Sequence, residues 1–155
     1  MKTISRRQML LMTPMLALAA QRLGAQQAPR VDVYKDPACS CCGLWVAHLQ
    51  REGFTATATN VPDITAIKVK NHVPGKLQSC HTALVGGYVI EGHVPASDIH
   101  RLLKERPKVA GLAVPGMPTG SPGMEGANGK PYDVLAFNAD GTTRVYSTQQ
   151  PLARG

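Results

Sequence analysis

The stretch VDVYKDPACSCCGLWVAHLQREG, residues 31–53, passes from a strand pattern through a cysteine-rich turn into a helix pattern. Residues 31–34 form a short β-branched and aromatic run that Pro37 closes, which predicts a strand ending in a turn. Residues 43–52 carry apolar side chains at helical spacing, and Gly53 is placed to end a helix. Three cysteines follow the turn: Cys39, Cys41 and Cys42. The stretch therefore predicts thiols at the N-terminus of a helix that follows a strand.

A second strand and a second helix are predicted next. Residues 54–61 alternate as a strand does. Residues 63–71 follow a proline and have a helical pattern, with Ile64 and Ile67 facing inward. The chain thus continues the alternation of strand and helix that the first stretch begins.

A hairpin and a third helix complete the predicted core. Residues 82–85 and 88–90 flank a Gly-Gly pair, which is a hairpin signal. Ser97 is predicted to cap a helix that Pro107 stops. The resulting order, β-α-β-α-β-β-α, is that of a thioredoxin-like α/β core, a central sheet with helices on both faces.

The C-terminal part differs in composition. Residues 109–131 are rich in glycine and proline and predict a long, ordered or semi-ordered loop. Residues 132–137 and 143–146 flank Asp140-Gly141 and predict a terminal β-hairpin. Because no internal repeat or long linker is present, we expect one domain over residues 26–155.

The first residues have the anatomy of an export signal. A positive region that contains Arg6 and Arg7 precedes an apolar run over residues 9–20, which is too short to span a bilayer. Cleavage is expected after Ala25, and the arginine pair resembles a twin-arginine signal. The sequence therefore predicts that residues 1–25 direct export to the periplasm of a Gram-negative bacterium, without a permanent membrane anchor.

The basic charge belongs largely to this segment. The whole chain has a formal net charge of +7, and removal of residues 1–25 takes away four cations and no acid, which leaves +3. No Lys/Arg cluster with interleaved aromatic residues remains in the rest of the chain. Nucleic-acid binding is therefore unsupported.

The cysteine spacing does not suit a purely structural disulfide framework. Four cysteines allow three pairings, and an oxidising periplasm favours disulfides. However, a bond between the neighbours Cys41 and Cys42 would be strained. In a thioredoxin-like core the chain returns to the first strand-to-helix turn just before the third strand. Cys80 precedes that strand, so we expect it to lie beside Cys39, Cys41 and Cys42.

Soft-metal binding suits the same spacing. Zinc sites built from four cysteines generally use two C-x-x-C pairs, whereas this chain has one such pair, Cys39 and Cys42. Copper(I) prefers thiolates and accepts two or three of them, so several Cu(I) ions could share bridging sulfurs. The residues therefore favour a cysteine-bridged polynuclear Cu(I) site over mononuclear zinc.

Four further side chains are candidate ligands. His81 directly follows Cys80, and His93 lies in the turn after the predicted hairpin. Met117 and Met124 are the methionines that remain after the signal. Imidazole and thioether both bind copper, although these histidines could equally be hydrogen-bonded and these methionines could fill gaps in the packing.

Three segments together resemble the exported copper-resistance proteins of the CopG type, a family also described as a domain of unknown function. They are CSCCGLW (39–45), SCHTALVGGYVIEGHVPA (79–96) and GLAVPGMPTGSPGME (111–125). The resemblance implies a thioredoxin-like fold, a polynuclear copper site bridged by cysteines, and a periplasmic role in copper resistance that includes Cu(I)/Cu(II) interconversion. It also implies copper ions and a periplasmic copper-handling or redox protein as partners. The family's cysteines correspond to Cys39, Cys41, Cys42 and Cys80.

Two other functions stay open at the level of sequence. One is a thiol-disulfide oxidoreductase with Cys39 as nucleophile and Cys42 as resolving thiol. Against it, Ser79-Cys80 stands where such enzymes have a cis-proline. The other is a structural zinc domain with an interaction surface in the loop over residues 109–131.

Overall fold

The computed structural model describes residues 27–153. The export signal and its cleavage site, predicted over residues 1–25, lie outside this part of the chain. Among the described residues, no helix has the length and apolar character that a membrane crossing requires.

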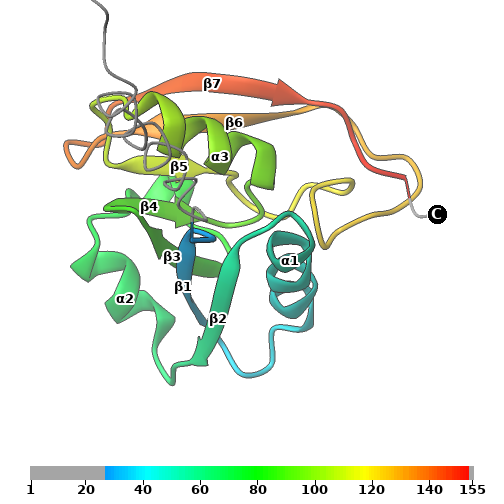
Figure 1. The fold of residues 1–155 in the computed structure, drawn as a ribbon, viewed down its shortest axis with the longest axis horizontal. Coiled ribbons are helices and arrows are strands. Elements are labelled where there is room, and N and C mark those ends of the chain that lie inside the picture. Colours follow the sequence, from blue (N-terminus) through cyan, green and yellow to red (C-terminus); the bar gives the residue numbers. More distant parts are fainter. Residues whose placement is uncertain (1–26, 154–155) are drawn as a thin grey trace, which may run out of the picture.

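The described residues form a mixed α/β fold with three helices and seven strands (Figure 1). The strands are β1 (Arg30–Lys35), β2 (Thr55–Asn60), β3 (His81–Val85), β4 (Tyr88–Glu91), β5 (Gly111–Ala113), β6 (Tyr132–Phe137) and β7 (Thr143–Gln149). The helices are α1 (Ser40–Arg51), α2 (Ile64–Lys70) and α3 (Ala96–Glu105), and a short 3-10 helix, η1 (Gly75–Leu77), precedes β3. The strands form one sheet in the order β2-β1-β3-β4-β5-β6-β7.

The strand directions bring the end of β1 next to the beginning of β3. β1 runs parallel to β2 because α1 provides the crossover between them, and it runs antiparallel to β3. Lys35, the last residue of β1, is paired with His81, the first residue of β3. Consequently, the residues that follow β1 and those that precede β3 meet at the same edge of the sheet.

The two faces of the sheet are covered differently. α1 and α3 share one hydrophobic core with the inward residues of β1, β3 and β4, and Trp45 of α1 donates a hydrogen bond to the Val94 carbonyl (2.8 Å). α2 covers the opposite face, where Lys68 contacts Thr82 of β3 and Glu91 of β4. Figure 1 shows β1, β2 and β3 between α1 and α2. The side chains of Thr82 and Glu91 therefore point away from the core that α1 covers.

The order of elements from β1 to α3 agrees with the predicted order, but two details of the helices differ. The N-cap position of α3 is Pro95, not Ser97, because Pro95 has an extended conformation (φ −61°, ψ 143°) and the helix begins at Ala96; the Pro95 side chain makes no capping hydrogen bond. In α2, Ile64 and Ile67 are only half-buried, whereas Lys68 is the buried residue. The buried partner Glu91 explains this, because it draws the lysine inward.

The segment over residues 109–131 is not only a loop. Gly111–Ala113 forms β5, which pairs parallel to β4 and antiparallel to β6 and so joins the predicted terminal hairpin to the sheet. A Cβ atom at position 111 would lie 1.8 Å from the Val89 carbonyl oxygen, so only glycine allows this close pairing. The glycine that suggested a loop is thus the residue that permits the strand.

Candidate metal centre

Three cysteines occupy the first turn of α1 and the residue before it. Cys39 is the N-cap, with an extended backbone (φ −77°, ψ 96°), and its side chain makes no capping hydrogen bond. Cys41 and Cys42 follow in the helix, and no acidic residue lies in its first turn. The open N–H groups and the positive end of the helix dipole stabilise thiolates at this position.

Cys80 joins these three cysteines from the edge of β3. The sulfur atoms of Cys39, Cys41, Cys42 and Cys80 all lie within 4.8 Å of one another. The antiparallel pairing of β1 with β3 accounts for this, because it places the residue before β3 beside the turn after β1. The expected convergence of these four sulfur atoms is therefore present in the structure.

Two of the four sulfurs are covalently joined. Cys39 and Cys42 form a disulfide, with their Cα atoms 5.6 Å apart, whereas Cys41 and Cys80 are free. The Cys41 sulfur lies 3.5 Å from that of Cys39. Metal ions bind cysteine as thiolate, so all four sulfurs become available as ligands only after this disulfide is reduced.

Cys80 also contacts two histidines. Its sulfur lies 3.0 Å from His93 Nε2 and 3.3 Å from His81 Nδ1. His93 Nδ1 lies 2.7 Å from the Pro122 carbonyl oxygen, which can only accept, so Nδ1 carries the proton and Nε2 presents its lone pair to Cys80. Burial lowers the pKa of His93 and favours this neutral form. A neutral imidazole fixed through its other nitrogen is the usual state of a histidine ligand.

His81 is buried and has an unsatisfied nitrogen. Its ring centroid lies 4.2 Å from that of Trp45, and its Nε2 has no hydrogen-bond partner among the described residues. Burial, with smaller contributions from His93 and Lys68, holds the pKa of His81 well below its usual value. Cys80, His81 and His93 form a second group whose ligand atoms all lie within 4.8 Å of one another. Cys80 is therefore common to a sulfur group and a mixed sulfur and nitrogen group.

The Cys80 thiol keeps its proton when no metal is bound. Burial and, to a smaller extent, the nearby Cys41 raise the pKa of Cys80 to about 11. A bound soft cation would displace this proton, because a coordinating thiol is deprotonated outright. Cation binding at Cys80 is thus expected to release a proton.

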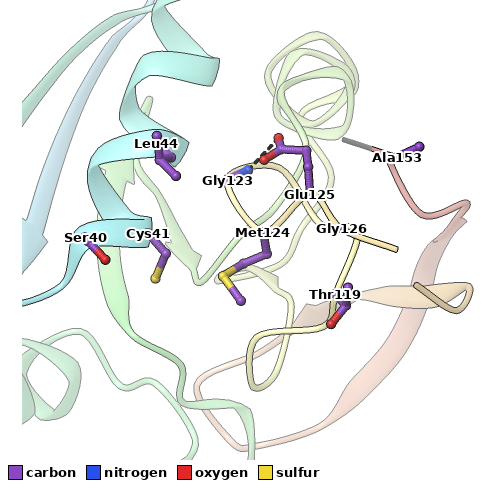
Figure 2. Close-up of a pocket in the computed structure, with 9 residues that line it drawn as sticks. All are labelled: Ser40, Cys41, Leu44, Thr119, Gly123, Met124, Glu125, Gly126 and Ala153. Carbon is purple, nitrogen blue, oxygen red and sulfur yellow. Dashed lines mark hydrogen bonds between the residues drawn. The ribbon is translucent and has the colours of Figure 1, made fainter. Parts of the chain in front are cut away.

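The two methionines lie in different surroundings. Met124 lines a cavity of about 730 Å³ that opens beside Cys41, between α1 and residues 119–126. Figure 2 shows the sulfur atoms of Met124 and Cys41 projecting into the same space. Met117 is 52% exposed and does not line this cavity. The structure thus places Met124 in the cavity beside Cys41 and Met117 outside that cavity.

The loop that carries Met124 packs closely against α1. A Cβ atom at Gly123 would lie 2.8 Å from the backbone nitrogen of Trp45 and 3.0 Å from the carbonyl oxygen of Cys41, and Gly123 has φ +85°. The Gly123 amide also donates a hydrogen bond to Glu125 (2.8 Å), which Figure 2 shows as a dashed line. Glycine at this position therefore allows the loop to approach the cysteine turn.

Sequence reasoning missed one polar group near the site. Glu91 accepts hydrogen bonds from Lys68, Thr82 and the backbone amide of Ser79, which immediately precedes Cys80. Neither Lys68 nor Glu91 stands out in the sequence, because each is a single charged residue beside apolar neighbours. Only their burial in the fold marks them.

The donor set fits a soft cation. Four sulfurs and two imidazoles form the two potential ligand groups that share Cys80, the Met124 thioether lines the cavity beside Cys41, and no carboxylate belongs to either group. Thiolate, thioether and imidazole are the ligands that copper prefers, whereas hard cations such as Mg²⁺ and Ca²⁺ require oxygen ligands. The residues present therefore suit copper.

Comparisons with known proteins agree with this chemistry. A family model described as a protein of unknown function, DUF411, matches residues 77–124. Two similar solved structures are described as copper resistance protein CopG, form 1 and form 2, each with 41% sequence identity. Form 1 gives a TM-score of 0.73 over 78% of this chain and 97% of that chain. Form 2 gives 0.74 over 79% and 98%, respectively. None of the curated proteins matches the chain. With this identity and coverage, the chain belongs to the CopG-type copper-resistance family.

Proposed function

We propose that the reduced protein binds several Cu(I) ions through bridging thiolates and thereby serves copper resistance. The ligands proposed are Cys39, Cys41, Cys42 and Cys80. One observation carries the proposal, namely that two separate segments of the chain bring these four sulfurs within 4.8 Å of one another. Membership of the CopG-type family supports a copper-related role.

Several bridged Cu(I) ions suit the site better than a single zinc ion. Four thiolates this close together repel one another unless cations neutralise them, and several monovalent ions achieve this. Adjacent residues such as Cys41 and Cys42 point in different directions and suit bridging between ions. Tetrahedral zinc requires four sulfurs directed at one point.

Further ligands are proposed at the edges of the cluster. His93 presents a lone pair beside Cys80, and His81 has an unsatisfied buried nitrogen in the same group. Met124 projects into the cavity next to Cys41. Met117 is a weaker candidate because it is largely exposed.

The proposed setting is the periplasm. The sheet order β2-β1-β3-β4 with α1 and α3 on one face and α2 on the other supports a thioredoxin-like core, and residues 26–155 would form the exported domain after removal of residues 1–25. The proposed activity includes interconversion of Cu(I) and Cu(II). Oxidation of each Cu(I) releases one electron, so a periplasmic redox protein is the partner class that would accept it.

Copper loading of the reduced protein tests the proposal. We expect more than one copper per chain by elemental analysis, together with sulfur-to-copper charge-transfer absorption. Cys41→Ser should reduce both, whereas Ser40→Ala, at an exposed neighbouring position, should change neither. One copper or less per chain, unchanged by Cys41→Ser, would contradict the proposal. Loading with copper and zinc in competition should give a copper protein.

A thiol-disulfide oxidoreductase is the second candidate, and the Cys39–Cys42 disulfide at the start of α1 favours it. A substrate thiolate would attack this disulfide, form a mixed disulfide and release one cysteine thiolate; a second substrate thiol would then complete the exchange. Rapid reduction of insulin by the metal-free protein, kept in its dithiol form by an added thiol reductant, would support this function by the reverse of this exchange. Slow or absent turnover would favour copper binding.

A further inference from the structure

A buried ion pair lies on the face of the sheet that α2 covers. Lys68 of α2 and Glu91 at the end of β4 are 3% and 0% exposed, and the Lys68 ammonium contacts the Glu91 carboxylate. Lys68 also donates a hydrogen bond to Thr82 (3.1 Å). Removing two charges from water is costly, and well-packed apolar residues often stabilise a protein equally well. Stability alone is therefore a weak reason for this pair.

The Glu91 carboxylate reaches the segment that carries Cys80. One oxygen accepts a hydrogen bond from the Ser79 amide (2.6 Å), and the other accepts one from the Thr82 hydroxyl (2.6 Å). Ser79 and Cys80 lie between η1 and β3, so no neighbouring strand supplies an acceptor for the Ser79 amide. Glu91 takes the place of that missing acceptor.

Other contacts fix Ser79 from different sides. The Ser79 hydroxyl donates a hydrogen bond to the Gly116 carbonyl. Gly92, at φ +70°, lies so close that a Cβ atom there would be 2.6 Å from the Ser79 hydroxyl oxygen. Cys80 follows Ser79 directly, so the direction of its side chain depends on how the Ser79 backbone is fixed.

We propose that Glu91 is a positioning residue for Cys80, with Lys68 as its counter-ion. Lys68 neutralises the buried Glu91 carboxylate, the carboxylate fixes the Ser79 amide, and the fixed backbone aims the Cys80 sulfur at the sulfurs of Cys39, Cys41 and Cys42. This inference rests on the proposed copper function. Loss of the contact between Glu91 and Ser79 is expected to weaken Cu(I) binding about 10- to 100-fold, as is usual for groups that orient ligands.

Two double variants separate positioning from a purely structural role. Lys68→Met with Glu91→Gln removes both charges but keeps an oxygen that can accept from Ser79. Lys68→Met with Glu91→Leu removes both charges and also the acceptor. Neither variant leaves an uncompensated buried charge, so the two differ mainly in the contact with Ser79.

Cu(I) affinity in competition with a chelator, together with the charge-transfer spectrum, provides the readout. The glutamine variant should stay close to the native protein, whereas the leucine variant should show the loss of affinity and an altered spectrum. Equal affinity and identical spectra in the two variants, whether both are native-like or both are weakened, would overturn the proposal.

A measurement on the metal-free protein keeps the inference testable if the leucine variant does not fold. In the native protein and in the glutamine variant, the Ser79 amide should exchange slowly with solvent and show a downfield proton shift. Fast exchange of this amide in the native protein would overturn the inference. Failure of the native protein to bind copper would contradict the proposed function instead, so the two failures are distinguishable.

Discussion

Two regions contribute to one site in different ways: the α1 turn, which carries Cys39, Cys41 and Cys42, and the corner before β3, which comprises Cys80 with His81 and His93. At the α1 turn, Cys39, Cys41 and Cys42 are neighbours in sequence, and two of them form a disulfide. At the corner, Cys80 stands beside His81 and His93, and these contacts include residues that only the fold brings together. Oxidation of Cys39 and Cys42 decides which sulfurs of the α1 turn can bind a metal ion. Protonation and burial decide how readily the Cys80 sulfur does so.

This difference indicates how the site is expected to respond to its surroundings. Reduction of the Cys39–Cys42 disulfide frees two thiols at the α1 turn. The corner offers the same sulfur and imidazole groups whether or not this disulfide is present. The proposed polynuclear site draws on both regions, because neither supplies the four sulfurs alone. A change in one region should therefore alter copper binding differently from a change in the other region.

The largest effect is expected from Cys80→Ser, which removes the corner from the sulfur group. A hydroxyl is a poor ligand for Cu(I), so the variant should lose polynuclear binding and its charge-transfer absorption. The free energy of unfolding of the metal-free protein should change by about 1 kcal/mol or less, since the residue is only partly buried. Elemental analysis and urea unfolding measure the two quantities. Native copper stoichiometry in this variant would show that the corner is not needed.

Oxidation should have the next largest effect. With the Cys39–Cys42 disulfide intact, two of the four sulfurs cannot act as thiolates, so the oxidised protein should bind fewer Cu(I) ions than the reduced protein. Anaerobic titration before and after reduction checks this. A variant with Cys39→Ser and Cys42→Ser is the control, because its binding should not respond to reductant in this way. Equal binding by both redox forms of the native protein would remove the distinction between the regions.

Substitution of His93 should sharpen the description of the corner. His93→Ala removes the lone pair beside Cys80 and leaves the Pro122 carbonyl without its donor. We expect a loss of about 1–3 kcal/mol in the free energy of unfolding, as for other unsatisfied buried groups. We also expect copper affinity to fall about 10- to 100-fold, because His93 Nε2 lies beside Cys80 and is proposed as a ligand. His93→Gln, which can donate to the same carbonyl, should recover part of the stability. Unchanged copper affinity in both variants would exclude His93 from the site.

The smallest effect concerns pH. Burial raises the pKa of Cys80 from 9.0 to about 11, so the folded state retains a proton that the unfolded state loses. This contribution to stability is complete below pH 9.0 and is lost as the pH rises toward about 11. Urea unfolding of the reduced, metal-free protein across this range should show a fall that is smaller in Cys80→Ser. The same fall in both proteins would mean that other groups cause it.

The features that could be predicted from the sequence are those with local signals. Strand and helix patterns around the cysteines predicted the order of elements from β1 to α3, and that order was enough to place Cys80 beside the α1 turn. The hairpin over β6 and β7 was predictable because Asp140-Gly141 separates two strand-like runs. In these cases neighbouring residues determine the local conformation.

The features that were missed depend on contacts between distant residues. β5 was hidden because Gly111 suggests a loop, although it is the close approach to Val89 that requires glycine. The burial of Lys68 depends on Glu91, and the orientation of His93 depends on the Pro122 carbonyl. No local pattern encodes such pairs, because each partner has an ordinary sequence context.

X-ray absorption at the copper edge of the reduced, copper-loaded protein tests the central claim most directly. The account predicts copper surrounded mainly by sulfur, with a second copper within bridging distance, and loss of that copper-to-copper signal in Cys80→Ser. A single copper ion with no neighbouring copper, or a spectrum that Cys80→Ser leaves unchanged, would contradict it.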